Sequence, residues 1–155
     1  MKVSDILRFK GTTLFTVTPN TSLVAAVQIM SEKDIGSLVV MERSDLVGIL
    51  TFREVINSMA KGHGTVGQET VGAVMEKSPM TCTSEMDLDE ARRIMLDQHM
   101  RYLPVLDDGT LNGVISFYDV AKAVVEAQGF ENSMLKAYIR DWPSEAGASS
   151  AAPKA

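Results

Sequence analysis

The sequence is poor in the features that secreted, membrane-spanning and redox-active proteins depend on. Its single cysteine, Cys82, cannot form a disulfide within the chain. Charges at Lys2, Asp5 and Arg8 interrupt the N-terminal stretch, which therefore offers no apolar run for a signal peptide or a membrane-spanning helix. We expect a cytoplasmic protein whose thiol is kept reduced and which has no membrane partner.

Positive charge and histidine are scarce as well. The chain has 15 lysines and arginines against 20 acidic residues, a formal net charge of -5. Such a balance provides no general attraction to nucleic acid or to anionic lipid. Neither His63 nor His99 has a second histidine, a cysteine or an acid at the spacing of metal ligands. We therefore expect no nucleic acid and no metal ion as a partner.

What the chain does contain is one segment written twice. A shift of 65 residues places Thr16 on Thr81, and the agreement continues without a gap to the pair Val55 and Val120. The matching pairs in between include Leu23 and Leu88, Ala26 and Ala91, Met30 and Met95, Gly48 and Gly113, and Phe52 and Phe117. Ungapped agreement of this length indicates a duplicated structural unit. With 155 residues, the chain is long enough for one buried core.

Hydrophobic spacing predicts a helix early in each copy. Leu23, Ala26 and Met30 recur at the interval of an amphipathic helix, and the second copy repeats this stripe. Asp87 and Glu90 stand at the positions of a capping box, so we expect an acidic box to start the helix of the second copy.

Two short strands and a second helix are predicted after the first helix. The apolar runs that predict the strands are 37–41, 47–50, 102–106 and 113–115. Residues 107–109, Asp-Asp-Gly, supply the hairpin turn of the second copy. The second helix begins at Thr51 or Ser116. A short strand is expected before the first helix, at 81–83 in the second copy, so each copy has the order β-α-β-β-α and the fold class is α/β (α+β).

The duplicated unit is expected to fill residues 1–126. Its parts are a first repeat at 2–60, a connector at 61–69 and a second repeat at 70–126. The connector is rich in glycine. Residues 3–7 resemble 71–75, so each repeat is expected to begin with a short helical lead-in. A C-terminal helix is predicted at 127–143, followed by a disordered tail at 144–155.

The junction between the second strand and the second helix contains a hydroxyl residue and an acid in both copies. It reads GILTFRE from Gly48 and GVISFYD from Gly113. The hydroxyl residue, with an acid three positions later, can be a capping box that satisfies helix N–H groups and nothing more. The same helix start attracts phosphate, and an acid one turn in can accept both hydroxyls of a ribose. Both interpretations stay open and can hold together.

These elements resemble the cystathionine-β-synthase (CBS) domain, whose pattern combines a Leu-x-x-Ala helix, a Leu-Pro-Val strand and a Gly-apolar-apolar-Thr/Ser-x-x-Asp ending. The second copy matches at 88–91, 103–105 and 113–119, and the first has weaker counterparts at 23–26, 38–40 and 48–54. The resemblance implies two repeats packed with pseudo-twofold symmetry around two ligand clefts. It also implies a module that senses AMP, ADP, ATP, NAD or S-adenosylmethionine and does not catalyse a reaction.

The resemblance further implies roles for individual residues. Asp119 would hold the ribose hydroxyls, and Ser116 would face the ribose or phosphate. The other ligand-binding residues expected in the second copy are Thr81, Cys82, Thr83, Arg101, Tyr102 and Pro104. Those expected in the first copy are Thr51, Glu54, Arg53, Thr16, Val17 and Lys10. Glu54 is one methylene longer than the aspartate of the family, and Val39 replaces its proline, so the second copy is the better candidate site.

The sequence thus predicts a regulatory module that binds an adenine nucleotide without a metal. AMP is the first expectation, with NAD, ADP or ATP as others, and the signal would be cellular energy or redox state. The resemblance implies a homodimer and a downstream protein that the sequence does not identify. No nucleophile and base can be paired, so we expect no enzyme. Two alternatives stay open, namely a structural or dimerisation module with degenerate clefts, and a nucleotide-processing enzyme that uses Glu54 and Asp119.

Overall fold

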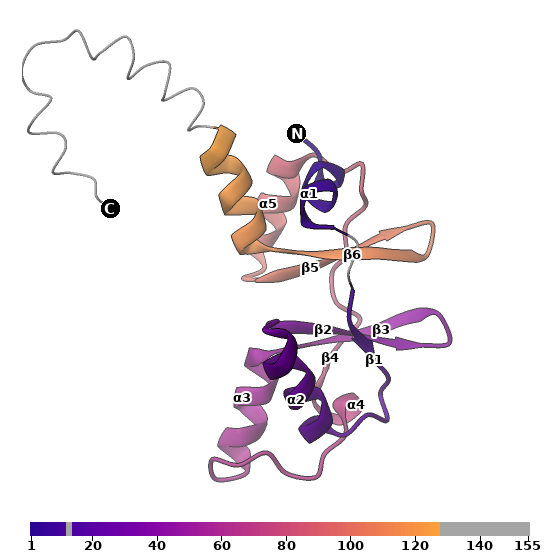
Figure 1. The fold of residues 1–155 in the computed structure, drawn as a ribbon, viewed down its shortest axis with the longest axis vertical. Helices are drawn as coiled ribbons and strands as arrows, with labels where there is room; N and C mark the ends of the chain where they lie inside the picture. Colours follow the sequence, from indigo (N-terminus) through magenta and orange to yellow (C-terminus); the bar gives the residue numbers. More distant parts are fainter. Residues whose placement is uncertain (12–13, 128–155) are drawn as a thin grey trace, which may run out of the picture. The chain divides into compact units, whose positions relative to one another are not determined.

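The computed structural model describes residues 1–11 and 14–127, and these form a mixture of helices and strands that confirms the predicted α+β class (Figure 1). The chain divides into two units, Met1–Phe117 and Tyr118–Ala155. The elements of the first unit are α1 (Val3–Lys10), β1 (Thr16–Val17), α2 (Leu23–Lys33), β2 (Ser37–Glu42), β3 (Asp45–Thr51), α3 (Phe52–Lys61), α4 (Val71–Val74), β4 (Glu76–Lys77), α5 (Leu88–Asp97), β5 (Tyr102–Asp107) and β6 (Thr110–Ser116). Residues 117–127 are helical. Beyond residue 127, the predicted C-terminal helix and tail lie outside the described residues.

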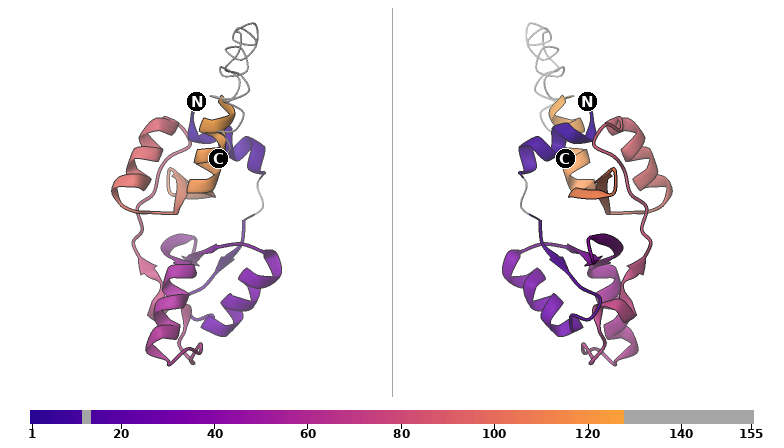
Figure 2. Two further views of the ribbon diagram at one scale, coloured as in Figure 1. Left: turned by 90° about the vertical axis from the view of Figure 1, so that its left-hand side faces the viewer. Right: turned by 90° about the vertical axis from the view of Figure 1, so that its right-hand side faces the viewer.

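A four-stranded sheet in the order β1-β2-β3-β4 organises the first repeat. β1 is parallel to β2, whereas β3 is antiparallel to both β2 and β4. Helices α2 and α3 lie on the same side of this sheet (Figures 1 and 2). The strand, helix, strand, strand, helix order predicted for the first copy is confirmed.

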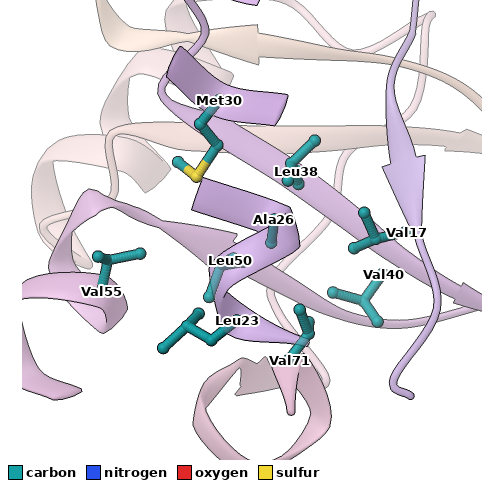
Figure 3. Packing of buried hydrophobic residues seen from close by; sticks show 9 residues of the cluster. All are labelled: Val17, Leu23, Ala26, Met30, Leu38, Val40, Leu50, Val55 and Val71. Carbon is teal, nitrogen blue, oxygen red and sulfur yellow. The ribbon is translucent and has the colours of Figure 1, made fainter. Parts of the chain in front are cut away.

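The core of the first repeat forms between α2 and the sheet. Figure 3 shows Leu23, Ala26 and Met30 of α2 together with strand residues of the same cluster. The predicted apolar stripe is therefore the buried face of the helix. Burying a side chain such as Leu23 stabilises the fold by about 1.5–3 kcal/mol, so this stripe determines which face of α2 packs on the sheet. The cluster consists of Val17, Leu23, Ala26, Met30, Leu38, Val40, Leu50, Val55 and Val71.

The second repeat is built around the β5–β6 hairpin. Tyr102 pairs with Ser116 at one end, and Asp108 and Gly109 form the turn at the other with φ values of 51° and 81°. An Asp-Gly pair suits this turn because both positions need positive φ. The predicted first strand of this copy is reduced to one parallel bridge, in which Cys82 N–H donates to Pro104 O at 2.9 Å.

Each helical lead-in packs on the other repeat. Thr21 O accepts from Val71 N–H at 2.8 Å, so the start of α4 is bound to the first repeat, and β4 extends the first sheet. At the other end of the unit, Val3 N–H donates to Met86 O at 3.0 Å, and α1 lies among second-repeat elements (Figures 1 and 2). The two lead-ins were predicted from the sequence, whereas this exchange was not.

Gly48 is required by the close approach of β4. A Cβ atom at this position would lie 2.8 Å from the backbone oxygen of Glu76, a distance that real side chains essentially never show. The glycine of the repeated junction therefore serves strand pairing at this point.

The acidic capping box predicted for α5 is wrong. Asp87 is the N-cap residue, but its side chain makes no capping hydrogen bond. Instead, Lys2 forms an antiparallel bridge with Asp87, and Leu88 N–H donates to Met1 O at 2.9 Å. The backbone that precedes α1 thus supplies an acceptor at the start of α5, so this N–H needs no side-chain cap.

Candidate functional site

A cavity of about 580 Å³ opens at the start of α3, within the unit Met1–Phe117. Its wall combines the end of β3, the first turns of α3, one residue of β4 and the segment that leads into β5. This volume is in the range of small-molecule pockets. The lining residues are Ile49, Thr51, Phe52, Arg53, Glu54, Ile56, Asn57, Glu76, Gln98, Met100, Arg101 and Tyr102.

A capping box shapes the helix start that faces this cavity. Glu54 Oε1 accepts from Thr51 N–H at 2.7 Å and from Thr51 Oγ1 at 2.6 Å. Thr51 Oγ1 in turn accepts from Arg53 N–H at 3.2 Å. The capping interpretation of the first junction is therefore confirmed. A ligand hydroxyl that binds Glu54 Oε1 has to compete with Thr51.

Charges of both signs line the cavity. Arg53 and Arg101 contribute guanidinium groups, and Glu54 and Glu76 contribute carboxylates. Arg53 Nη2 donates to the backbone oxygen of His99 at 2.9 Å. The two arginines and the N-terminus of α3 together favour an anionic group on a ligand.

An apolar surface adjoins these charges. Phe52 is 55% exposed and Ile56 is 61% exposed, although both are large hydrophobic residues. They stand one turn apart on α3, so their side chains lie on the same side of the helix. The cavity can therefore accommodate a ligand that carries a flat apolar ring as well as an anionic group.

Tyr102 is held against Gly36 at this wall. A Cβ atom on Gly36 would overlap the Tyr102 hydroxyl oxygen and would lie 3.0 Å from Tyr102 Cζ. The ring of Phe52 is also close, with its Cε2 atom 3.4 Å from the same point. Only a residue without a side chain permits this position of Tyr102.

The structure brings five of the predicted site residues to one cavity. Thr51, Arg53 and Glu54 were expected in the first copy, and Arg101 and Tyr102 in the second. Because the cavity joins the first helix junction to the segment before β5, residues assigned to different copies share its wall.

The other predicted residues stand elsewhere. Thr16, Thr81 and Thr83 are exposed, whereas Val17, Cys82 and Pro104 are buried. Lys10 Nζ donates to Val114 O on β6 at 2.8 Å. Ser116 is the last residue of β6, and Asp119 belongs to the unit that begins at Tyr118. None of these nine residues is among those that line the cavity in the described part of the chain.

Sequence reasoning missed several cavity residues. Gln98 and Met100 flank the segment already singled out at Arg101, so proximity in the sequence could have found them. Glu76 enters the wall because β4 pairs with β3, with Glu76 opposite Ile49. Gly36 is not a lining residue, but it shapes the wall through its contact with Tyr102. No local pattern indicates either of these two contacts.

The Cys82 thiol is not a reactive group. Burial, and to a lesser degree the charge of Asp107, raises the pKa of Cys82 to about 12. A thiol with such a pKa stays protonated at neutral pH and is a poor nucleophile. Cys82 therefore acts as a small buried side chain beside β5.

Residues 1–11 and 14–127 contain no group of three or more histidine, cysteine, aspartate or glutamate side chains arranged to hold a metal ion. Within the same ranges, no helix combines the length and the apolar character needed to cross a bilayer.

The chain belongs to the CBS domain family, whose model matches it twice, at residues 3–61 and 71–126. Among curated proteins, it is 31% identical over 148 residues to the CBS domain-containing protein CBSX3, mitochondrial, of Arabidopsis thaliana, covering 89% of this chain and 71% of that protein. A solved structure of a protein with CBS domains from Burkholderia ambifaria MC40-6 is 33% identical with a TM-score of 0.77, covering 83% of this chain and 96% of that one. The crystal structure of CBSX2 in complex with AMP is 27% identical with a TM-score of 0.67, covering 81% and 97%.

Proposed function

We propose that this protein is a regulatory module that binds an adenine nucleotide, AMP foremost, in the cavity at the start of α3. The observation that carries the proposal is the cavity wall, where two arginines and a helix N-terminus adjoin the exposed Phe52 and Ile56. Phosphate suits the first group and a purine ring the second. The AMP complex of the related CBSX2 supports this choice of ligand.

Each part of the nucleotide has a partner in this proposal. Arg101 binds the phosphate, and Glu54 accepts a ribose hydroxyl in exchange for its contact with Thr51. The base lies against Phe52 and Ile56. NAD, ADP and ATP share the adenosine part and are the other ligands proposed.

The wider role follows from the fold family and from the site. Binding would report energy or redox state to a downstream protein in the cytoplasm, with the chain acting as a homodimer. We propose that no metal is required and that no reaction is catalysed. The Ser116 to Asp119 motif is proposed as a second binding element on sequence grounds, together with Thr81, Cys82 and Thr83.

Titration calorimetry on the full chain, stripped of bound nucleotide, tests this function. AMP, ATP, NAD and adenosine are added in turn, and AMP is expected to bind with micromolar affinity. Arg101→Gln should weaken AMP binding roughly tenfold or more, because it removes a charge-assisted hydrogen bond. Arg93→Gln is the matched control, since Arg93 is exposed on α5 and does not line the cavity.

Each alternative predicts a different result. If none of the four compounds binds, the module is structural and its clefts are degenerate. Release of phosphate or adenine from a bound nucleotide would indicate an enzyme, and Glu54→Gln would then abolish it. Asp119→Ala separates the two copies, because it weakens AMP binding only if the second copy holds the ribose.

A further inference from the structure

Arg53 joins two segments that are 46 residues apart in the sequence. Its side chain extends from the first turn of α3, and Nη2 donates to the backbone oxygen of His99 at 2.9 Å. His99 lies in the turn between α5 and β5. Both neighbours of His99 in the sequence, Gln98 and Met100, line the cavity. The contact between Arg53 and His99 therefore forms part of the cavity wall.

The turn that contains this carbonyl oxygen has a left-handed backbone conformation at His99. His99 has a φ of 54°, in the left-handed region that residues other than glycine rarely adopt. Backbone hydrogen bonds from His99 N–H to Leu96 O at 3.3 Å and from Met100 N–H to Met95 O at 2.9 Å close the end of α5. The Arg53 guanidinium adds a contact from another element to this turn.

A phosphate competes with such a contact. The acceptor on His99 is a neutral carbonyl, whereas a phosphate carries charge and can bind a guanidinium through two hydrogen bonds. Arg101 is two residues beyond His99 and lines the same cavity, so an anion drawn to Arg101 comes near Arg53. The guanidinium can then exchange the carbonyl for the stronger acceptor.

We propose that Arg53 is a ligand-released latch. In the free protein it holds the carbonyl of His99, and a phosphate-bearing nucleotide in the cavity takes over the guanidinium and releases that carbonyl. This inference rests on the proposed function. It goes further by naming the contact that changes when the ligand binds.

The residues at the equivalent positions of the duplicated sequence cannot form this latch. The shift of 65 residues that aligns the copies places Tyr118 at the position of Arg53 and Asp34 at the position of His99. Asp34 shares the left-handed conformation, with a φ of 54°. A tyrosine has no guanidinium, so the second copy cannot form the same contact. The proposed exchange is therefore specific to the pair Arg53 and His99.

Nuclear magnetic resonance of the full-length, isotopically labelled chain tests the latch directly. The HNCO experiment correlates the amide of Met100 with the carbonyl carbon of His99, whose frequency reports on the hydrogen bond from Arg53. Saturating AMP should shift this carbon upfield as the bond is lost. Adenosine, which lacks the phosphate, should shift the amide signals of Phe52 and Ile56 and leave the His99 carbon in place.

Variants separate the latch from ligand binding. Arg53→Gln should place the His99 carbon at its released frequency without any ligand, and AMP should then move it no further. Arg53→Lys, a second variant in case the first perturbs the fold, should place it at an intermediate frequency. Arg93→Gln, the matched control, should behave as the original protein.

Three outcomes would overturn the proposal, and they are distinguishable. If AMP shifts the Phe52 and Ile56 signals but not the His99 carbon, the latch is wrong and the proposed function stands. If neither Arg53 variant moves the His99 carbon, the contact does not hold the turn. If neither AMP nor adenosine shifts any signal of a cavity residue, the proposed function fails and ligand release fails with it.

Discussion

Asp107 shows at the scale of one residue how the second repeat is held together. Its carboxylate accepts from Ser84 N–H at 2.9 Å and also from the Ser84 hydroxyl and the Asn112 amide. The side-chain hydrogen bond from Ser84 is the main cause that lowers the pKa of Asp107, followed by the backbone hydrogen bond from the same residue. One carboxylate thus ties the end of β5 to the segment after Cys82 and to β6.

Replacing Asp107 should make the free energy of unfolding depend less on pH in the acid range. Because the pKa of Asp107 is lower in the folded state than its ordinary value of 3.8, its contribution is fully present above that pH and is lost as the pH falls below it. Asp107→Asn should therefore lower the free energy of unfolding by about 1–2 kcal/mol at pH 7. Urea unfolding at pH 7 and at lower pH measures the difference between the two proteins.

The control for this prediction is Asp108→Asn, one residue further along the hairpin. Asp108 has a φ of 51°, which asparagine also tolerates, so its replacement should change stability little at either pH. If the gap between Asp107→Asn and the original protein is as large in acid as at pH 7, the charge of Asp107 is not what stabilises the fold.

At the scale of elements, the cavity depends on how the start of β5 meets the start of β2. Tyr102 is the first residue of β5, and Gly36 directly precedes β2. The missing side chain at Gly36 leaves room for the Tyr102 ring, which in turn lies close to Phe52 at the start of α3. Three elements from different parts of the chain therefore fix one side of the cavity.

Gly36→Ala should damage the cavity more than the fold. The new methyl group overlaps the Tyr102 hydroxyl oxygen, so the ring has to move, at a cost of about 1–3 kcal/mol in stability. AMP binding, measured by calorimetry, should weaken by roughly tenfold, because the displaced ring removes free energy of this size from the complex with AMP. The double variant Gly36→Ala with Tyr102→Phe removes the overlapping oxygen and should recover part of both losses. Failure of the second change to recover either would show that Tyr102 is not the residue displaced.

The elements themselves were largely predictable because their signals are local. Leu23, Ala26 and Met30 lie within one helix, and the Asp-Gly turn lies within one hairpin, so spacing and turn chemistry were sufficient. The pairing of β4 with β3 was not predictable, since the hydrophobic pattern of neither segment indicates which strand it pairs with. The Asp87 box failed for the same reason, because the acceptor that replaces it is Met1 O, which precedes the first copy.

The candidate site likewise combines residues that the sequence could predict with contacts that only the tertiary structure reveals. Thr51, Arg53 and Glu54 form one motif, and the resemblance to a family pointed to Arg101 and Tyr102. That these two groups share a cavity is a tertiary fact, and so is the presence of Glu76 and the role of Gly36. The sequence also gave no indication that Arg53 contacts the carbonyl of His99.

At the scale of the whole molecule, the boundaries of the two sequence copies differ from the boundaries of the two packed repeats. Val71 stands at the start of the second copy, yet it is 0% exposed within the core cluster of the first repeat. Val3 stands at the start of the first copy, yet its N–H donates to Met86 O at 3.0 Å in the second. The exchange of lead-ins couples the stability of each repeat to a segment of the other.

Val3 and Val71 provide a matched pair for testing this coupling. They occupy equivalent positions of the two lead-ins, and each is 0% exposed. Val3→Ala and Val71→Ala should each cost about 2 kcal/mol, which corresponds to roughly thirtyfold faster amide hydrogen exchange where the loss is felt. Native-state exchange on the full chain locates that effect. We expect Val3→Ala to accelerate exchange in α5 and β5, and Val71→Ala to accelerate it in α2 and β2, so that each substitution loosens the repeat to which it does not belong in the sequence. The opposite pattern, with each variant loosening its own sequence copy, would mean that the lead-ins are not exchanged.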